Sequence, residues 1–338
     1  MSRHRVAIVG CGNVSDMHFR GYLDRPDRVE IVAAVDPDPA RRAWAAENFG
    51  VTDTYASIGE LLAGADFEVA SVCTPSTVRL EAVRELAEGG KHLLVEKPMA
   101  DDMTEAREIV RTAGDAGVLL AVDQNFRDHY AFGLARDAIA AGRIGRVLGI
   151  DQSELMWREV VGWRAEARHH ALAVMGVHWF DGFRYLIDAQ PDAADRRDAD
   201  WIVARTFTHP AMHTAGETDA FIQVHFGGIP VNYTQSFASR VNRVETIVLG
   251  ETGTLRLTYD ALEVHTADGV ETTSNPCAGD GKPISAYRSL ERLLDALDSG
   301  TQPGNSGEDN LKTLSLLFAA YESARTEQPV ALENGLLP

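Results

Sequence analysis

Short apolar runs alternate with helix-like segments over the first third of the chain. The runs occupy residues 6–9, 29–35, 69–73, 93–95 and 118–122. Segments of helical composition lie between them, for example at 39–49, 77–88 and 103–113. Continuous apolar strands that alternate with helices are typical of a parallel sheet covered on both faces. The pattern therefore predicts a doubly wound α/β domain over residues 1–123.

From residue 124 onward the pattern changes to longer β-like stretches. They lie at 147–156, 201–208, 220–226, 231–238, 245–249, 254–258 and 262–266. Helices are predicted at 131–141, 174–187 and 311–325, and a mobile loop at 272–283, which is rich in Gly, Pro, Ser and Asn. Alternation such as Thr246-Ile247-Val248-Leu249 favours a mainly antiparallel sheet with one covered face. We expect a second, α+β domain for substrate binding and oligomerisation over 124–338, whose late helix (308–326) is a candidate to pack back on the first domain.

The composition is that of an ordinary folded protein, but the charge is strongly acidic. Apolar residues make up 45% and charged residues 24% of the 338 positions, which argues against a disordered chain. The 32 Lys and Arg residues against 50 Asp and Glu residues give a net charge of −18. Such a field repels phosphate backbones and anionic lipid surfaces, so we expect neither a nucleic-acid partner nor a membrane partner.

The cysteines indicate the cellular compartment, and the second sheet indicates how the protein assembles. No apolar stretch approaches the roughly 20 residues of a membrane helix, and we predict no signal peptide. Cys11, Cys73 and Cys277 are an odd number of cysteines at wide spacing, which favours a reducing compartment, and the cytoplasm is the simplest expectation. Because exposed apolar sheet faces usually mark interfaces, we expect a homodimer or homotetramer formed through the second sheet.

A glycine-rich turn joins the first strand to the first helix, with the sequence Gly10-Cys11-Gly12-Asn13-Val14-Ser15. Gly10 permits a tight turn, and Gly12 lets a pyrophosphate approach the backbone at the positive end of the helix. Ser15 takes the place of the usual third glycine, and its small side chain still allows the helix to pack closely on the strand. The turn predicts a dinucleotide site, although two glycines alone are weak evidence.

Asp36 strengthens this prediction, because it ends the second strand a little over 20 residues after the glycine turn. A carboxylate there accepts hydrogen bonds from the adenosine ribose and repels a 2′-phosphate, which favours NAD over NADP. Arg41 and Arg42 follow closely and soften that preference if they face the ribose, but solvated positions on the next helix are the simpler interpretation. The alternative for the whole motif is a structural glycine turn followed by a helix-capping Asp.

Further polar motifs follow the predicted strands, where ligands bind in open α/β sheets. They are Thr74-Pro75 and Glu96-Lys97-Pro98, and later in the chain Gln124-Asn125-Phe126-Arg127, Gly162-Trp163-Arg164, Gly176-Val177-His178-Trp179-Phe180-Asp181 and Ser306-Gly307-Glu308-Asp309. In this order they resemble the Gfo/Idh/MocA oxidoreductases, the family named for glucose-fructose oxidoreductase and inositol dehydrogenase. The resemblance covers nearly the whole chain. It implies a Rossmann domain, an open-faced sheet domain, NAD(P), and hydride transfer at a hydroxyl or keto group of a sugar, inositol or related polyol.

Lys97 is the first candidate for catalysis. Removal of hydride from a secondary alcohol needs a group that takes the hydroxyl proton, and a lysine beside a cationic nicotinamide ring can be tuned to do so. We expect Lys97 to take this proton or to orient the hydroxyl, and Pro98 to restrict the lysine to extended geometry. Glu96 is expected to fix the lysine or to contact the nicotinamide ribose. Outside this array, Glu-Lys-Pro is usually a solvated turn.

His178 and Asp181 are the second pair of catalytic candidates, one helical turn apart on one helix face. The resemblance implies that His178 shares proton transfer with the lysine, and histidine suits this role because it titrates near neutral pH. A buried structural role is the alternative for each residue. The chain departs from the family at Val174, where many members carry an aspartate, and at Arg79, where a histidine is common.

The remaining candidates are weaker. Cofactor contacts are predicted for Gly10, Gly12, Asn13, Val14, Asp36, Thr74, Pro75, Glu96, Lys97, Pro98, Asn125, Trp163 and Arg164, and substrate contacts for Arg127, His169 and His170. Asn125, Arg127, Trp163 and Arg164 alternatively only join the two domains. No metal is expected, because hydride transfer to nicotinamide needs none and the histidines lack obvious carboxylate partners.

Two other functions stay open at this point. Some relatives bind the dinucleotide without turnover and act as sensors, and the loss of the usual aspartate at Val174 is compatible with this. A glycosidase or epimerase-like enzyme, in which bound NAD is reduced and reoxidised within one turnover, is the other alternative. Release of NADH distinguishes a dehydrogenase from both.

Overall fold

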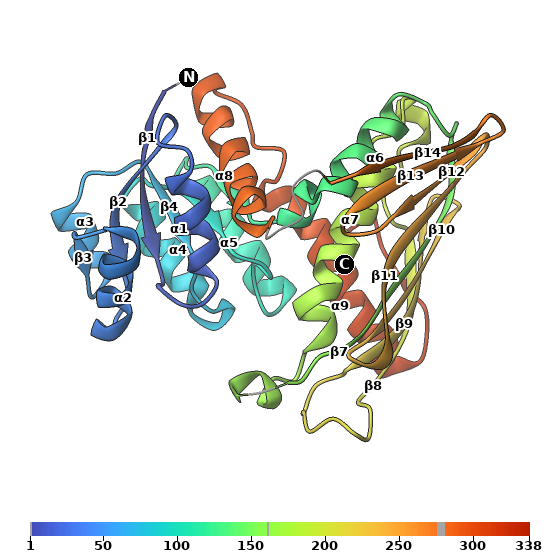
Figure 1. The fold of residues 1–338 in the computed structure, drawn as a ribbon. Helices are drawn as coiled ribbons and strands as arrows, with labels where there is room; N and C mark the ends of the chain where they lie inside the picture. The colour runs from blue at the N-terminus through green and yellow to red at the C-terminus, as the bar shows by residue number, and fades with distance from the viewer. Residues whose placement is uncertain (1, 161, 276–280) are drawn as a thin grey trace. The chain divides into compact units, whose positions relative to one another are not determined.

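The computed structural model describes residues 2–160, 162–275 and 281–338 (Figure 1). The chain divides into two compact units, which are described separately below. The first comprises Met1–Asp128 and Asp280–Leu311, and the second comprises His129–Gly279 and Lys312–Pro338. The boundary predicted at residue 123 thus differs from the structure by a few residues. The structure also assigns residues 280–311 to the first unit, where the sequence offered only the late helix over 308–326 as a candidate to pack.

The first unit contains a six-stranded parallel sheet in the order β3-β2-β1-β4-β5-β6. Its strands are β1 (His4–Val9), β2 (Val29–Val35), β3 (Thr54–Tyr55), β4 (Val69–Val72), β5 (His92–Val95) and β6 (Leu120–Val122). Its helices are α1 (Ser15–Leu23), α2 (Pro39–Phe49), α3 (Ile58–Gly64), α4 (Arg79–Glu88), α5 (Met103–Asp115) and α8 (Lys282–Ser299). The strand order reverses between β1 and β4, so the predicted doubly wound fold is confirmed. Ligands of such sheets bind beside this reversal, at the carboxyl ends of the strands.

Helix α8 completes the core of this unit, beside α1 (Figure 1). Its buried Tyr287, Leu290, Leu293 and Leu294 belong to the same apolar cluster as the strands β1 and β4. Its first residues fall within the mobile loop predicted over 272–283, and that prediction was wrong at both ends. Strand β14 continues to Ser274 and α8 begins at Lys282, while residues 276–280 lie outside the described part of the chain.

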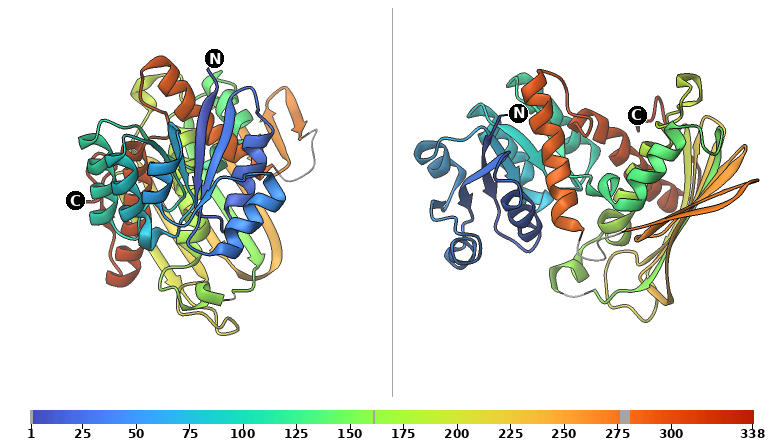
Figure 2. Two further views of the ribbon diagram at one scale, coloured as in Figure 1. Left: turned by 90° about the vertical axis from the view of Figure 1, so that its left-hand side faces the viewer. Right: turned by 45° about the horizontal axis from the view of Figure 1, so that its top comes forward.

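The second unit contains a nine-stranded sheet in the order β14-β13-β12-β11-β7-β10-β9-β8-β15. Its strands are β7 (Val147–Trp157), β8 (Trp201–Phe207), β9 (Asp219–Phe226), β10 (Ile229–Ser236), β11 (Ala238–Gly250), β12 (Gly253–Leu257), β13 (Ala261–Thr266), β14 (Gly269–Ser274) and β15 (Val330–Ala331). Among the strands that the structure describes here, only β7 and β10 pair in parallel, so the mainly antiparallel sheet that the sequence predicted is confirmed. Helices α6 (Tyr130–Ala140), α7 (Val177–Ile187) and α9 (Gly307–Thr326) lie over one face (Figures 1 and 2).

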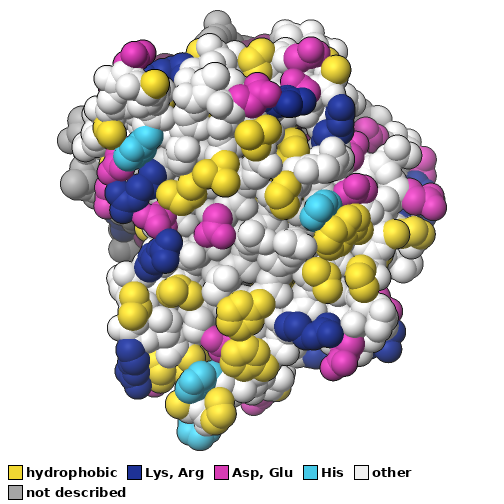
Figure 3. Space-filling model, turned by 90° about the vertical axis from the view of Figure 1, so that its right-hand side faces the viewer, with side chains coloured by type: hydrophobic (Ala, Val, Ile, Leu, Met, Phe, Trp, Pro, Cys, Tyr) yellow, Lys and Arg dark blue, Asp and Glu magenta, His cyan; other side chains and the backbone are white. Residues whose placement is uncertain are grey.

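The two faces of this sheet differ in the way that period-two alternation predicts. Ile222, Val224 and Tyr233 are buried beneath the helices, whereas the alternate residue Phe221 is 54% exposed on the opposite face. Apolar side chains are scattered over that open face together with charged ones (Figure 3). The exposed large apolar residues of its strands include Leu148, Phe207, Phe221, Leu249 and Val270. In the part of the chain that the structure describes, no helix has both the length and the hydropathy needed to cross a membrane.

Candidate active site

The glycine turn follows β1 at the strand reversal and depends on Gly10. This residue has φ +95°, a conformation that side chains other than glycine rarely adopt. A Cβ atom at Gly10 would lie 3.0 Å from the carbonyl carbon of Cys73, at the end of β4. Gly10 N–H donates to the carbonyl of Val35 at 2.7 Å, which joins the turn to β2 as well. Gly10 is therefore required for the chain to turn this close to its neighbours.

Gly12 leaves open space in front of the first turn of α1. A Cβ atom placed there would meet nothing within 4 Å. Val14 is the N-cap of α1 and makes no side-chain capping bond, while the Ser15 hydroxyl donates to the carbonyl of Gly12 at 2.7 Å. The N–H groups of this turn and the positive end of the helix dipole suit an anionic ligand. The turn thus fits the pyrophosphate of a dinucleotide.

Asp36 lies where the sequence predicts a ribose contact, directly after β2. Its Oδ2 accepts a hydrogen bond from Cys11 N–H at 2.8 Å, and its Oδ1 accepts one from Asp38 N–H at 2.9 Å. Each carboxylate oxygen has further acceptor capacity for a ribose hydroxyl. Arg42 donates to the main-chain carbonyls of Asp36 and Pro37, so its guanidinium supports this loop. The carboxylate disfavours a 2′-phosphate at this position.

The motifs after β4 and β5 are joined by a buried arginine. Arg79, in the first turn of α4, is 2% exposed and donates to the main-chain carbonyls of Thr74 and Pro98. Burial lowers the pKa of Arg79, and the surrounding carboxylates and the Cys73 thiol oppose this shift. Arg79 therefore holds the two loops against each other. From the sequence, this residue stands out only as a departure from the family pattern.

Glu96 points into the first unit and is only 4% exposed. Its Oε1 lies 2.8 Å from Nε2 of His18 on α1, and its Oε2 accepts a hydrogen bond from the N–H of Lys97 at 3.1 Å. Of the two roles predicted for Glu96, this geometry matches the one in which it fixes the lysine turn. Lys97 itself is half-buried, and its peptide bond to Pro98 is cis.

The pKa shifts of His18, Glu96 and Asp123 point to an ion pair beside a neutral acid. Burial opposes the charging of His18, but Cys73, Tyr22 and Glu96 raise its pKa well above the ordinary value. Burial also opposes the charging of Glu96, yet its hydrogen bond to His18 and the charge of that residue lower its pKa. Burial raises the pKa of Asp123, which follows β6, well above its ordinary value, and the Glu96 carboxylate adds to that shift.

His178 and Asp181 lie in the first turns of α7, in the second unit, and both are buried. A π-helical turn, Leu172–Gly176, leads directly into this helix. Such turns are rare and occur frequently at functional sites. Oδ1 of Asp181 accepts a hydrogen bond from the Thr313 hydroxyl of α9 at 3.1 Å and lies 3.7 Å from Arg184. Asp181 therefore connects α7 to α9, and its catalytic role stays a prediction.

Asn125 and Arg127 belong to the first unit rather than to the start of the second. The Arg127 guanidinium is buried and donates to the carbonyl of Gly304 at 2.8 Å and to Oδ2 of Asp309 at 2.6 Å. The Arg127 and Asp309 motifs thus meet in an ion pair that joins the end of β6 to the start of α9. This geometry supports a structural role for Arg127. Its predicted substrate contact stays a prediction.

The predicted substrate histidines occupy different surroundings. His169 stacks on Tyr321 of α9 with 3.9 Å between ring centroids, and His170 is buried edge-on to Phe237 at 5.6 Å. The cofactor candidates Trp163 and Arg164 lie on the short helix Gly162–Glu166, and their side chains are outside the described part of the structure.

Comparison with known proteins identifies the chain. Residues 4–124 match the model of the oxidoreductase family with an NAD-binding Rossmann fold, and residues 132–256 match the Gfo/Idh/MocA C-terminal domain. The protein belongs to the Gfo/Idh/MocA oxidoreductase family. Its predicted family, its NAD-dependent oxidoreductase class and its fold are thereby confirmed.

Relatives of this family match over almost the whole chain. A D-apiose dehydrogenase from Paraburkholderia graminis is 29% identical over 99% of this chain and 91% of its own length. A 1,5-anhydro-D-fructose reductase from Ensifer adhaerens is 28% identical over 98% of this chain and 100% of its own. A crystal structure of an oxidoreductase from Agrobacterium radiobacter, in complex with NAD+, L-tartaric acid and magnesium, has a TM-score of 0.87 at 24% identity and 98% coverage of both chains.

Val174, the departure from the family pattern, lies in the π-helical turn and packs on an apolar cluster. The cluster includes the buried Ala171 and Phe237 and the partly buried Met156 and Met175. This Gfo/Idh/MocA protein therefore presents a methyl-rich surface one turn before His178. The nearby carboxylate of Glu217 accepts hydrogen bonds from the N–H groups of His170 and Leu172 and from the Tyr321 hydroxyl, and so anchors the segment that leads to His178.

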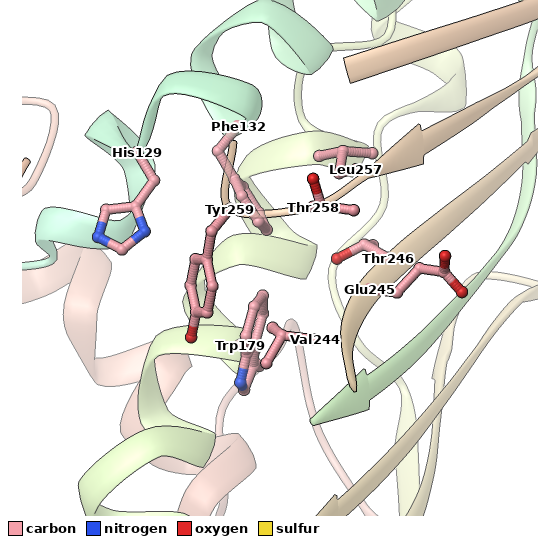
Figure 4. Close-up of a pocket in the computed structure, with 9 residues that line it drawn as sticks. All are labelled: His129, Phe132, Trp179, Val244, Glu245, Thr246, Leu257, Thr258 and Tyr259. Carbon is pink, nitrogen blue, oxygen red and sulfur yellow. The ribbon is translucent and has the colours of Figure 1, made fainter. Parts of the chain in front are cut away.

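Pockets among the described residues of the second unit include the following two. One, between α6, α7 and the sheet, is narrow and lined by ring, aliphatic and polar side chains, and Tyr259 stands in it between His129 and Trp179 (Figure 4). The Trp179 indole N–H donates to the buried Glu154 carboxylate at 2.6 Å. The other pocket, of about 550 Å³, is lined by His169, Glu217 and Tyr321 together with the end of β8. The larger pocket is the one that contains a residue predicted to contact substrate.

Neither His18 nor Asp123 is among the site residues predicted from the sequence. Within the described residues, they and Glu96 form a group of three buried side chains whose potential ligand atoms lie within 4.8 Å of one another. A signal existed for Asp123, since it is a polar residue directly after an apolar strand at the ligand-binding edge of the sheet. His18 carried no such signal, because a histidine in an amphipathic helix has no spacing that marks it.

Proposed function

We propose that this protein oxidises a hydroxyl group of a sugar or related polyol by transferring hydride to NAD, or reduces the corresponding keto group. The observation that carries the proposal is the lysine turn after β5. There Lys97 follows a strand that ends at the same edge of the sheet as the strand before the glycine turn, with its backbone fixed by the inward-facing Glu96. The sugar-related names of the two relatives, matched over at least 98% of this chain, support the substrate class.

Lys97 takes the hydroxyl proton in this proposal, in its amine form. Bound NAD supplies the acceptor for the hydride that leaves the same carbon. The Arg79 guanidinium holds the Thr74 and Pro98 carbonyls and so keeps the loop that carries Lys97 in place. A fixed lysine lowers the entropic cost of proton transfer, because the base is already oriented when the substrate binds.

His178 is proposed as the second proton-transfer group, with Asp181 as its structural support through Thr313 and α9. His178 is buried in the first turn of α7, where its position is fixed by packing. The apolar surface around Val174 cannot accept hydrogen bonds from a substrate. We therefore propose a substrate that carries fewer hydroxyl groups on the side that faces Val174 than on its other sides.

We further propose a homodimer or homotetramer that assembles through the open face of the second sheet. Phe207 and Phe221 stack on that face with 6.2 Å between ring centroids, and they are 45% and 54% exposed. Large apolar side chains at such exposure favour burial against a second copy. A cytoplasmic location belongs to the same proposal, because Cys11 and Cys73 are buried free thiols of a kind typical of reducing compartments.

A screen with purified protein tests the function. NAD and then NADP are offered with a panel of aldoses, anhydro-sugars, inositols and sugar acids, and NADH or NADPH formation is followed by absorbance. We expect NADH to accumulate with one sugar class, and NADP to be used more slowly because of Asp36. Binding of NAD without turnover on every compound would instead favour a sensor.

A further inference from the structure

Three buried ionisable side chains from different elements meet beneath the lysine turn. His18 comes from α1, Glu96 follows β5, and Asp123 follows β6. His18 and Asp123 are 1% and 0% exposed, respectively. Burial of three such groups is costly unless they share charge and hydrogen bonds, so the cluster needs a physical explanation.

The cluster is connected directly to the backbone of Lys97. One oxygen of Glu96 lies 2.8 Å from His18 Nε2, and the other accepts the Lys97 N–H at 3.1 Å. On its other side, His18 Nδ1 lies 2.8 Å from the Tyr22 hydroxyl and 3.1 Å from the Ser71 hydroxyl. Both ring nitrogens of His18 therefore have hydrogen-bond partners inside the core, and neither is exposed to solvent.

The separations identify a shared proton rather than a metal ion. Two ligands of one tetrahedral zinc ion lie about 3.3 Å apart, because each is about 2.0–2.1 Å from the metal. His18 Nε2 and Glu96 Oε1 are only 2.8 Å apart, which is the length of a charge-assisted hydrogen bond. An imidazolium that donates at Nε2 to Glu96 and at Nδ1 to a hydroxyl satisfies both ring nitrogens.

Asp123 is the third member, with Oδ2 3.5 Å from His18 Nε2. Two carboxylates that share one cation in a dry core do not both ionise easily, because like charges repel there. Glu96 is the closer partner of His18 and also faces Lys97 and Arg79, so Glu96 carries the charge and Asp123 stays protonated. The cluster then contains one cation, one anion and one neutral acid.

We propose that His18 is a positioning residue for hydride transfer, which as an imidazolium pairs with the Glu96 carboxylate, holds it inward against Lys97 and offsets its charge there, and so sets the pH range in which Lys97 exchanges its proton. The proposal rests on the function proposed above, in which Lys97 takes the substrate hydroxyl proton. His18 and Glu96 exchange no proton with substrate. They fix the backbone of Lys97 and place one negative charge beside its side chain.

The ionisable groups around this pair come from every element packed on it. Tyr22 belongs to α1 with His18, Cys73 follows β4, and Arg79 lies on α4. Lys97 follows β5, Asp123 follows β6, and the Ser289 hydroxyl of α8 faces Asp123. Arg79 keeps its charge at all accessible pH values, so the titration of interest is confined to Lys97 and the triad.

Two substitutions shift the pH profile in opposite directions under this proposal. His18→Gln removes the imidazolium and leaves Glu96 as an unpaired anion beside Lys97, which holds the lysine proton more tightly. Glu96→Gln removes the anion and releases that proton more easily. For substrate oxidation, we expect the acidic limb of the kcat profile to move to higher pH in H18Q and to lower pH in E96Q. We also expect kcat to fall about tenfold or more in each.

The controls separate this role from a structural one. Tyr22→Phe removes one hydroxyl contact of His18 but leaves Ser71 in reach of Nδ1, so we expect a profile that coincides with wild type. The Kd for NAD, measured by calorimetry, is expected to stay within about twofold in His18→Gln and Tyr22→Phe, since neither side chain belongs to the glycine turn or to the predicted cofactor contacts. An H18Q profile that coincides with wild type, or that moves to lower pH, overturns the proposal.

The wild-type enzyme provides a test that does not depend on the folding of H18Q. In ¹⁵N spectra of the histidine rings, one buried histidine is expected to remain doubly protonated above about pH 8. Its signal is assigned to His18 because Tyr22→Phe shifts it. A neutral His18 at about pH 7 overturns the proposal even if no substrate is found. Absence of turnover in the wild type contradicts only the proposed function.

Discussion

Gly12→Ala and Gly10→Ala form a matched pair of variants, because in one turn Gly12 leaves room for the cofactor whereas Gly10 allows the backbone to turn. At Gly12 an added methyl meets no atom within 4 Å, so the free energy of unfolding is expected to change by less than about 1 kcal/mol. The methyl does occupy the space in front of the N-terminus of α1. Loss of one hydrogen bond to a charged phosphate costs about 1.5–3 kcal/mol, so the Kd for NAD should rise about 10- to 100-fold.

Gly10→Ala, unlike Gly12→Ala, is expected to lower the free energy of unfolding. Its φ of +95° costs an alanine about 1–2 kcal/mol, and the contact of 3.0 Å with Cys73 adds about 1–3 kcal/mol of overpacking. The free energy of unfolding should therefore fall by about 2–5 kcal/mol, measured by urea denaturation of the protein without cofactor. NAD affinity is measured by calorimetry. An unchanged Kd in Gly12→Ala would refute the assignment of the pyrophosphate to this turn.

Three further predictions concern the lysine, the triad and the sheet. Lys97→Ala should lower kcat about 100-fold or more with little change in the Kd for NAD, measured by steady-state kinetics and calorimetry, and full retained activity would remove the lysine from the mechanism. Because the folded-state pKa of Asp123 is raised, its contribution to stability is lost as pH rises above the unfolded value of about 3.9. In urea denaturation, the free energy of unfolding of Asp123→Asn should therefore rise relative to that of the wild type by up to about 1.4 kcal/mol per pH unit. A constant difference between about pH 4 and pH 8 would show that Asp123 is ionised. Phe221→Asp should convert a dimer or tetramer to a smaller species in sedimentation at micromolar concentration, whereas a wild-type monomer would sink the assembly proposal.

Much of the first sheet was predictable because its strands are buried on both faces. The runs at 29–35 and 69–73 correspond almost residue for residue to β2 and β4. Helix α8 was missed because its apolar positions follow a Gly- and Pro-rich segment that dominated the local pattern. Its assignment to the first unit depends on contacts with α1, β5 and β6, far away in sequence, which periodicity cannot reveal.

The candidate site shows the same division between local and distant information. The glycine turn and the Lys97 motif were found because turn chemistry and position after a strand are local properties. The direction of a side chain is not local in this sense. Glu96 faces the interior because His18, 78 residues earlier, offers an imidazole there. Likewise, Arg127 is held by Asp309, which no spacing in the sequence connects to it.

Transfer of isotope is the most direct test of the central claim. Purified protein is incubated with NAD and a sugar that carries deuterium on the carbon to be oxidised, and the released cofactor is analysed by mass spectrometry. We expect deuterated NADH in an amount equal to the ketone or lactone formed, and formation of it at least about 100-fold more slowly with Lys97→Ala. Product formation without labelled NADH in solution would contradict this claim, and would point to an internal redox cycle.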